Sequence, residues 1–284
     1  MKLAESELIL NKDGSVYHLS LKPEDIGDII ITVGDPGRVH RVSQHFESID
    51  FEMNKREFIT HTGTYNKKKV TVISSGMGTD NVEILMNELD ALVNVDLKKR
   101  EVKKEKKSLD IIRLGTAGGI QNDMPLGSII YNHYGFGLDT LMSFYNYEES
   151  ASEIQITSNL QKVLDLPFKP YIGKCSDKLR KKFTNGYKQG NAITAPGFYA
   201  PQGRSIRLQP KFEKMLDKLT FFHEKGLWLT NFDMETAAYY AMGRLLGHET
   251  LSICTIVADR NSKKFLKNYN NVIDQMIVDL LSKI

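Results

Sequence analysis

Residues 111–119 read IIRLGTAGG, a short apolar run that ends in glycines. A similar arrangement recurs along the chain: DIIITV at 28–33 leads into GDPGR, VTVIS at 70–74 leads into SGMGTD, and LSICTIV at 251–257 leads into ADRN. Near-continuous β-branched runs are typical of strands that are buried on both faces. The four runs therefore predict buried strands, and the three glycine-rich stretches predict turns at their ends.

Two helical patterns lie between these strands. Residues 81–93 follow Thr79 and Asp80, both favourable N-cap residues, and residues 234–246 end before Gly247, a favourable C-cap. Strand, glycine turn and helix in repeated order indicate an α/β fold. Because no convincing linker interrupts the chain, we expect one domain with a central mixed, mostly parallel twisted sheet flanked by helices.

The composition excludes several classes of protein. The chain has 284 residues, of which 41% are apolar and 26% charged, which argues against disorder. No apolar run approaches the ~18–20 residues of a membrane helix, and the N-terminus lacks the pattern of a signal peptide. Cys175 and Cys254 are too few for a disulfide framework. We therefore expect a cytoplasmic protein with no membrane partner.

The basic charge is concentrated in one segment. Residues 98–107 read KKREVKKEKK, with seven basic and two acidic side chains. Since the whole chain carries a net charge of +3, the other residues sum to −2. Such a run is either a patch for a polyanion or a solvated connection, and the absence of interleaved aromatic residues favours the connection. We interpret it as a lysine-rich insertion and expect no nucleic-acid partner.

Two arginines accompany the glycine-rich stretches. Arg38 ends the GDPGR segment, and Arg113 lies just before Gly115 and Thr116. A guanidinium matches phosphate geometry through two parallel hydrogen bonds, and glycine amides let the backbone approach an anion. Neither segment fits a dinucleotide fingerprint or a P-loop. Each arginine alone could equally form a structural ion pair, but together they predict a phosphate site.

Two further clusters point to an organic ligand. Residues 197–204 read GFYAPQGR, which offers aromatic rings for stacking and Gln202 and Arg204 for the edge of a carbonyl-bearing heterocycle. The alternative is an ordinary proline-glycine loop. Residues 233–235 read DME at the start of a predicted helix. These carboxylates either cap the helix or accept hydrogen bonds from a sugar, with Met234 as an apolar wall.

Taken in order, six segments resemble one family. VGDPGR, KREF, SSGMG, IIRLGTAGG, FYAPQGR and NFDMETA resemble the nucleoside phosphorylases, which include uridine phosphorylase and the hexameric purine nucleoside phosphorylases. The resemblance covers residues 15–280. FYAPQGR and the early SVYHLSL are most similar to the uridine phosphorylase branch.

The resemblance implies reversible phosphorolysis of a pyrimidine nucleoside, with uridine as the preferred substrate, to free base and ribose 1-phosphate. Inorganic phosphate is then the co-substrate, with no metal or organic cofactor, although some family members place potassium near the glutamate that is Glu57 here. The implied assembly is a homo-oligomer, a dimer or hexamer, whose sites are shared between subunits. Carried over by position, phosphate binding falls to Gly34, Arg38, Arg56, Arg113 and Thr116, ribose binding to His18, Met234 and Glu235, and base binding to Phe198, Gln202 and Arg204. Arg56 and His18 would act from an adjacent subunit.

Two positions depart from the family pattern. Asp233 stands where the family usually has glutamate, which leaves its ribose contact open. Asp259 stands where uridine phosphorylases tend to have asparagine and where purine-specific relatives have a general acid nearby. Asp259 is thus a candidate general acid, or a structural partner of Arg260 or Arg204. The alternatives are a purine nucleoside phosphorylase, a hydrolytic nucleosidase and a non-catalytic nucleoside- or nucleic-acid-binding protein; the arginine set argues against the hydrolase.

Overall fold

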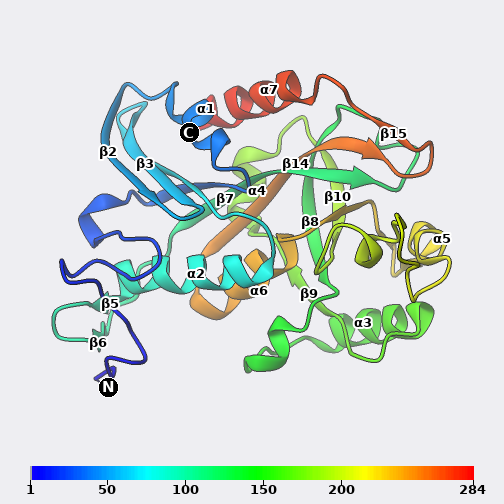
Figure 1. Cartoon of the computed structure of the whole chain (residues 1–284), viewed down its shortest axis with the longest axis horizontal. Coiled ribbons are helices and arrows are strands. Elements are labelled where there is room, and N and C mark those ends of the chain that lie inside the picture. The colour runs from blue at the N-terminus through cyan, green and yellow to red at the C-terminus, as the bar shows by residue number, and fades with distance from the viewer. Residues whose placement is uncertain (1) are drawn as a thin grey trace.

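The structure is a computed structural model that describes residues 2–284. A large mixed sheet runs through the centre of the molecule, with helices on both sides (Figure 1). Its strands are β1 (Ile29–Val33), β2 (Ser48–Lys55), β3 (Phe58–Tyr65), β4 (Lys68–Ser74), β7 (Asp110–Gly119), β8 (Ile129–Gly137), β9 (Tyr171–Lys174), β10 (Lys188–Thr194), β13 (Asn231–Asp233), β14 (Glu249–Asp259) and β15 (Lys264–Phe265). Two small hairpins are separate from it, namely β5 (Val95–Asp96) with β6 (Glu101–Val102), and β11 (His223–Glu224) with β12 (Leu227–Trp228).

The helices surround this sheet. They are α1 (Gly37–Ser43), α2 (Thr79–Asn94), α3 (Ala151–Leu164), α4 (Asp177–Phe183), α5 (Met215–Phe221), α6 (Thr236–Leu246) and α7 (Tyr269–Leu281). In Figure 1, α2 and α6 lie side by side below the sheet, and α1 and α7 lie above it. Among residues 2–284, no helix combines the length and apolar character needed to cross a bilayer.

The centre of the sheet is parallel, as the buried runs predict. β1 pairs in parallel with β4 and β7, and β7 pairs in parallel with β14. Antiparallel pairs add β3, β2, β9 and β15 around this centre. Because β14 pairs with both β7 and β8, the strands β7, β14, β8, β10 and β13 close into a ring. β14 pairs with β7 along its whole length, while β1 on the other side pairs with residues 110–114 and β13 with residues 118 and 119.

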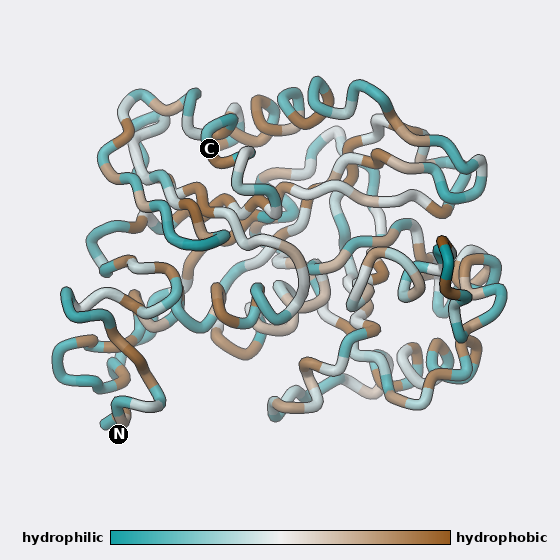
Figure 2. Tube along the Cα trace, in the orientation of Figure 1, coloured by the Kyte–Doolittle hydropathy of each residue, from teal (hydrophilic) through white to brown (hydrophobic). Residues whose placement is uncertain are grey.

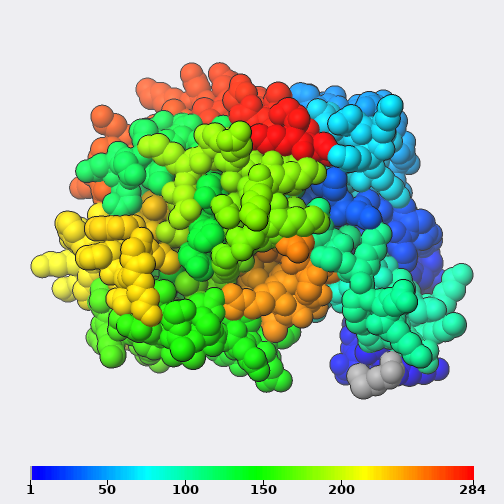
Figure 3. Space-filling model, turned by 180° about the vertical axis from the view of Figure 1, so that it is seen from behind, coloured from blue at the N-terminus to red at the C-terminus, as the bar shows by residue number. Residues whose placement is uncertain are grey.

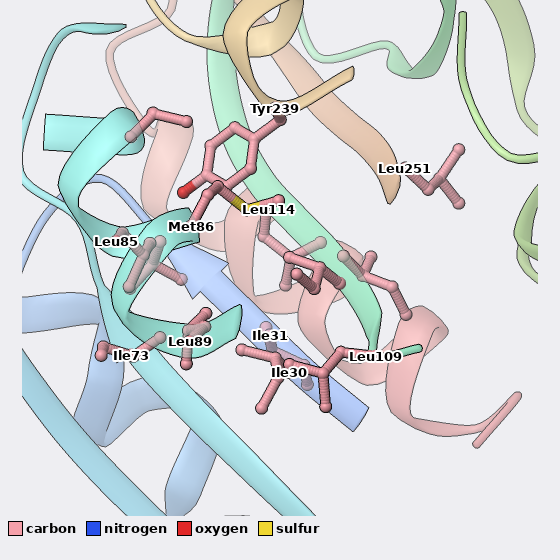
Figure 4. Packing of buried hydrophobic residues seen from close by; sticks show 14 of the residues in the cluster. Ile30, Ile31, Ile73, Leu85, Met86, Leu89, Leu109, Leu114, Tyr239 and Leu251 are labelled. Atoms are coloured by element: carbon pink, nitrogen blue, oxygen red, sulfur yellow. The ribbon is translucent and has the colours of Figure 1, made fainter. Parts of the chain in front are cut away.

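The core fills the space between this sheet and the helices. Figure 2 shows the central strands as largely apolar and the outer connections as hydrophilic. Figure 4 shows that Leu85, Met86 and Leu89 of α2 and Tyr239 of α6 belong to one buried cluster with Ile30, Ile31 and Leu114 of β1 and β7. This packing fixes where α2 and α6 begin, and both helices begin at the carboxyl edge of the parallel strands.

The predicted strands and helices are present, with three corrections. The stretch at 115–119 is not a turn, because β7 continues through it and pairs with the end of β14. The N-cap of α2 is Gly78, and Thr79 and Asp80 lie inside its first turn. The second helix begins at Thr236 rather than at residue 234, and it ends at Gly247 in the left-handed conformation, as expected.

The basic run forms an exposed connection. β5, a tight turn and β6 make a short hairpin, against which the N-terminal segment pairs through Lys2 and Glu101. Figure 3 shows the two as a corner that projects from the body. Lys107 forms an ion pair with Asp28, and Lys103 donates to the carbonyl of Val93, so part of the charge is used within the chain. That the run is an insertion stays a prediction.

The packing of α2 leads to a stability prediction. Leu89 is fully buried between α2 and the sheet, so Leu89→Ala removes apolar contacts and leaves a cavity that costs about 3 kcal/mol. Leu245→Ala on α6 is the matched control, because that side chain is 36% exposed. Urea unfolding measures both variants, and equal losses in the free energy of unfolding would contradict this account of the core.

Candidate functional site

The carboxyl ends of β1, β4 and β7 lie at one edge of the sheet, where open α/β sheets bind ligands. Gly34 and Arg38 follow β1, and Arg113 and Thr116 lie on β7. Burial lowers the pKa of Arg38, the Asp35 carboxylate opposes that shift, and the neighbouring Arg113 adds to it. Two guanidinium groups thus lie near enough to repel each other, an arrangement that an anion between them stabilises.

Arg113 is buried and paired with carboxylates. Its Nη2 lies 2.5 Å from Oε2 of Glu235, and its Nη1 lies 3.5 Å from Oδ2 of Asp233. Nη1 also reaches Oγ of Ser252 at 3.3 Å and Sγ of Cys254 at 3.1 Å. Burial alone lowers the pKa of Arg113, but these carboxylates raise it well above its ordinary value. Arg113 is therefore a permanent, rigidly held cation.

Gly115 makes room for this guanidinium. Residues two apart on a strand share a face, so the Arg113 side chain folds over Gly115. A Cβ on Gly115 would lie 2.1 Å from Nη1 of Arg113. Glycine at this position is therefore required by the side chain of Arg113 rather than by a turn.

Glu235 joins three parts of the site. It lies just before α6, its Oε2 holds Arg113, and its Oε1 accepts a hydrogen bond of 2.9 Å from the N–H of Gly78. Gly78 has a φ of +98° and ends the loop after β4. A single carboxylate thus fixes the arginine of β7 relative to the glycine loop and the start of α6.

Asp233 is turned into the protein. Its Oδ1 accepts a 2.8 Å hydrogen bond from Oγ1 of Thr194, and its Oδ2 accepts from the hydroxyl and, at 3.3 Å, the N–H of Thr236. It therefore satisfies the first turn of α6 from two residues before the N-cap. Because both oxygens are engaged and the residue is buried, the structure supports a positioning role rather than a ribose contact.

A second group of side chains comes from the loop after β10. The guanidinium of Arg204 lies 3.8 Å from the ring centre of Phe198, donates to the Phe198 carbonyl at 2.6 Å and hydrogen-bonds Oε1 of Gln202. Gln202 is buried and Phe198 is half-exposed. The three predicted base-binding residues therefore form one unit, in which an aromatic face and two hydrogen-bond donors are adjacent.

Arg260 belongs to the same group, and the sequence reasoning assigned it no binding role. Its Nη1 donates to the carbonyl of Gln202 at 2.9 Å. Burial and the charge of Arg260 lower the pKa of Arg204 to about 10. A Cβ on Gly118 would lie 3.5 Å from the Arg260 side chain and 3.7 Å from Nη2 of Arg204. This group therefore lies against the end of β7, further along the strand that carries Arg113.

Asp259 caps a turn. It accepts hydrogen bonds from the N–H groups of Asn261 and Ser262, at 3.0 and 3.1 Å, and from the Ser262 hydroxyl. The Ser262 hydroxyl contributes most to lowering the pKa of Asp259. Among residues 2–284 it forms no ion pair with Arg260 or Arg204, the structural partners considered above, and its contacts are those of its own turn. An ionised, turn-bound carboxylate is a poor proton donor.

His18 and Arg56 form a separate, more exposed cluster. The Arg56 guanidinium lies 5.7 Å from the ring centre of Tyr17, and the Tyr17 and His18 rings meet edge to face at 4.8 Å. In the part of the chain that the structure describes, neither predicted residue hydrogen-bonds to Arg113, Glu235 or Gln202. The chain brings His18 and Arg56 together, but their action in a neighbouring site stays a prediction.

Metal ligands were not expected. Within residues 2–284, no group of three or more His, Cys, Asp or Glu side chains is arranged to hold a metal ion.

Met234 is partly exposed beside Glu235, and Thr116 is partly exposed on β7. A potassium ion near Glu57 and the ligand contacts of Gly34, Thr116 and Met234 stay predictions.

Comparison with known proteins gives consistent matches. Residues 28–281 match the phosphorylase superfamily. The chain is 26% identical to a uridine phosphorylase of Thermococcus kodakarensis over 94% of this chain and 85% of that protein, and 25% identical to a DeoD-type purine nucleoside phosphorylase of Buchnera aphidicola over 94% and 100%. The crystal structure of a Trypanosoma brucei nucleoside phosphorylase, described as showing uridine phosphorylase activity, superposes with a TM-score of 0.87 and 28% identity, covering 98% and 100% of the two chains.

The close approach of Arg113 to Gly115 is testable by a double-mutant cycle. We expect Gly115→Ala to displace the guanidinium, cost about 1–3 kcal/mol of stability and weaken phosphate binding about tenfold or more. In an Arg113→Ala background the same change costs less than about 0.5 kcal/mol, because nothing remains for the Cβ to strike. Thermal unfolding and calorimetric titration with phosphate measure both effects; equal stability costs in the two backgrounds would refute the steric account.

Proposed function

The chain belongs to the phosphorylase superfamily, and from that membership we propose that it cleaves uridine with inorganic phosphate to give uracil and ribose 1-phosphate. Its type is established more broadly: it is a pentosyltransferase of the nucleoside phosphorylase family. The relatives include proteins named for uridine and for purine nucleosides, so the choice of base rests on the site of this chain.

Phosphate is the nucleophile in this reaction. One of its oxygens attacks C1′ of the ribose while the C1′–N1 bond breaks, and the bonding electrons leave with the base. Glycosidic cleavage passes through an oxocarbenium-like state, which a phosphate anion beside C1′ stabilises. Arg38 and Arg113 supply the cationic seat for that anion, so the protein contributes positioning and charge and no nucleophile of its own.

One observation favours a pyrimidine base. Gln202, Arg204 and Arg260 lie together at the end of β7, and the Gln202 carbonyl oxygen already accepts from Arg204. The two guanidinium groups and the Gln202 amide N–H₂ are donors, which suit the carbonyl oxygens of uracil and the negative charge that its ring gains as it leaves. Phe198, whose ring stacks under the Arg204 guanidinium, adds an apolar wall beside the same base.

The ribose lies between the two ends of the site. Glu235, which holds Arg113, and Met234 lie directly before α6, and we assign the ribose to them. His18 and Arg56 would complete the site from an adjacent subunit, because they share one exposed cluster with Tyr17 in this chain. We therefore propose a homo-oligomer with shared sites.

Purine nucleoside phosphorolysis is the second candidate. It is favoured by the purine-named relatives and by an aspartate at position 259. Protonation of a purine nitrogen by Asp259 would require the carboxyl in its protonated form, whereas Asp259 is bound to its own turn and has a lowered pKa. The site therefore supports the uridine proposal better.

A substrate panel tests the proposal. We expect phosphate-dependent release of uracil from uridine, with inosine and adenosine much poorer substrates, as followed by chromatography of the free base. Arg204→Ala should lower kcat/KM for uridine about 100-fold, because it removes a charged donor from the leaving base. Base release that ignores phosphate would instead indicate a hydrolase, and cleavage of inosine with inert uridine would overturn the pyrimidine assignment.

The role of Asp259 has its own test. We expect Asp259→Asn to keep kcat/KM for uridine within about threefold of the unmodified enzyme, since the carboxylate caps a turn and the asparagine Oδ1 accepts the same two backbone hydrogen bonds. A general acid would instead cost about 100-fold or more on removal. Steady-state kinetics with uridine and inosine, measured from about pH 5 to about pH 9, separates the two roles.

A further inference from the structure

The segment that carries His18 is anchored from both sides. Val16, Leu19 and Leu21 are fully buried in the core, while Tyr17 and His18 between them remain partly exposed. The apolar residues therefore act as three anchors for a tight turn, which the N–H of Ser20 closes by donating to the carbonyl of Val16 at 3.0 Å. They fix the path of the backbone, but they do not determine how the imidazole is oriented or which of its nitrogens carries the proton.

Glu88 of α2 supplies that missing constraint. Its carboxylate accepts the N–H of His18, 3.0 Å from each oxygen, and the N–H of Leu19 at 2.9 Å. The same carboxylate lies 2.6 Å from Nδ1 of the His18 ring. The Glu88 side chain is 13% exposed and the His18 side chain is 30% exposed, so water competes weakly for these contacts. One carboxylate thus binds the backbone and the ring of His18 together.

The chemistry of this contact determines the tautomer. An ionised carboxylate can only accept, so Nδ1 must carry the hydrogen that lies between them. In a neutral ring the other nitrogen, Nε2, then holds a free lone pair. Within residues 2–284, Nε2 of His18 makes no hydrogen bond. It is the nitrogen left to accept a hydrogen bond from a ligand.

We propose that Glu88 is a positioning residue for catalysis: it holds His18 in the Nδ1–H tautomer so that Nε2 accepts the hydrogen bond of the ribose 5′-hydroxyl. The inference rests on the proposed function, in which His18 meets that hydroxyl. Because the Tyr17 ring contacts both His18 and Arg56, the same clamp also supports the platform under Arg56. Glu88 itself touches neither substrate nor phosphate.

A substrate lacking the 5′-hydroxyl separates this role from a general structural one. For the unmodified enzyme we expect kcat/KM to be about tenfold or more higher for uridine than for 5′-deoxyuridine. Glu88→Gln presents an amide N–H₂ to a ring or backbone donor, so kcat/KM for uridine should fall to the value for 5′-deoxyuridine. The rate with 5′-deoxyuridine should change less than about threefold, and His18→Ala should give the same collapse of the ratio.

Glu83→Gln is the matched control. Glu83 lies on the same helix and hydrogen-bonds Tyr145 and Asn87, away from His18. This variant should retain the preference for uridine. A Glu88→Gln enzyme that retains that preference, or one that loses activity equally on both substrates, would show that Glu88 only supports the fold.

A second measurement needs no change at Glu88. In ¹⁵N-histidine-labelled full-length protein, the His18 signals, assigned by their loss in His18→Ala, should show a protonated Nδ1 and a bare Nε2 when the ring is neutral. The opposite tautomer would overturn the proposal. This readout is independent of turnover: if uridine is not cleaved, the proposed function fails while the tautomer still reports on the Glu88 contact.

Discussion

The site depends on one buried cation. Arg113 is buried on β7, a strand of the closed ring, and an unpaired guanidinium there would carry a large desolvation cost. Glu235 and Asp233 offset that cost and also bind the glycine loop after β4 and the first turn of α6. The ion pair therefore fixes the geometry of the site more than it stabilises the fold. Three elements that are distant in sequence are fixed relative to a single guanidinium.

Because β7 is paired with strands on both sides, it holds two groups of arginines at a fixed separation: Arg113 with Arg38, and Arg204 with Arg260. Arg113 lies in the middle of β7, close to Arg38 from the loop after β1. Gly118 lies near the end of β7, next to Arg204 and Arg260. Glycine at 115 and 118 lets guanidinium groups lie against the strand. The sequence run that defines the fold thus also sets the spacing between the proposed phosphate end and the proposed base end of the site.

Local patterns predicted much of this arrangement. The apolar runs gave β1, β4, β7 and β14, and the arginine and glycine spacing gave the residues that gather at the edge of the sheet. The glycines at 115–119 were misassigned as a turn, because strand pairing with β14 is a long-range contact that a local pattern does not contain. Arg260 escaped notice for a similar reason: only folding brings it to Gln202. An arginine directly after a long buried strand, as in ADRN, was the available signal.

Two carboxylates, one directly before α6 and one on α2, organise groups that we propose meet the substrate. Glu235 precedes α6 and holds Arg113, while Glu88 on α2 holds His18, and α2 and α6 pack against each other over the core. Leu89, next to Glu88, is buried in that packing, so the helix cannot rotate without moving the carboxylate. Arg113 and the partly exposed His18 are therefore both held by the layer that α2 and α6 form. If the histidine completes a neighbouring site, as proposed, this layer mechanically links two sites of an assembly through side chains that touch no substrate.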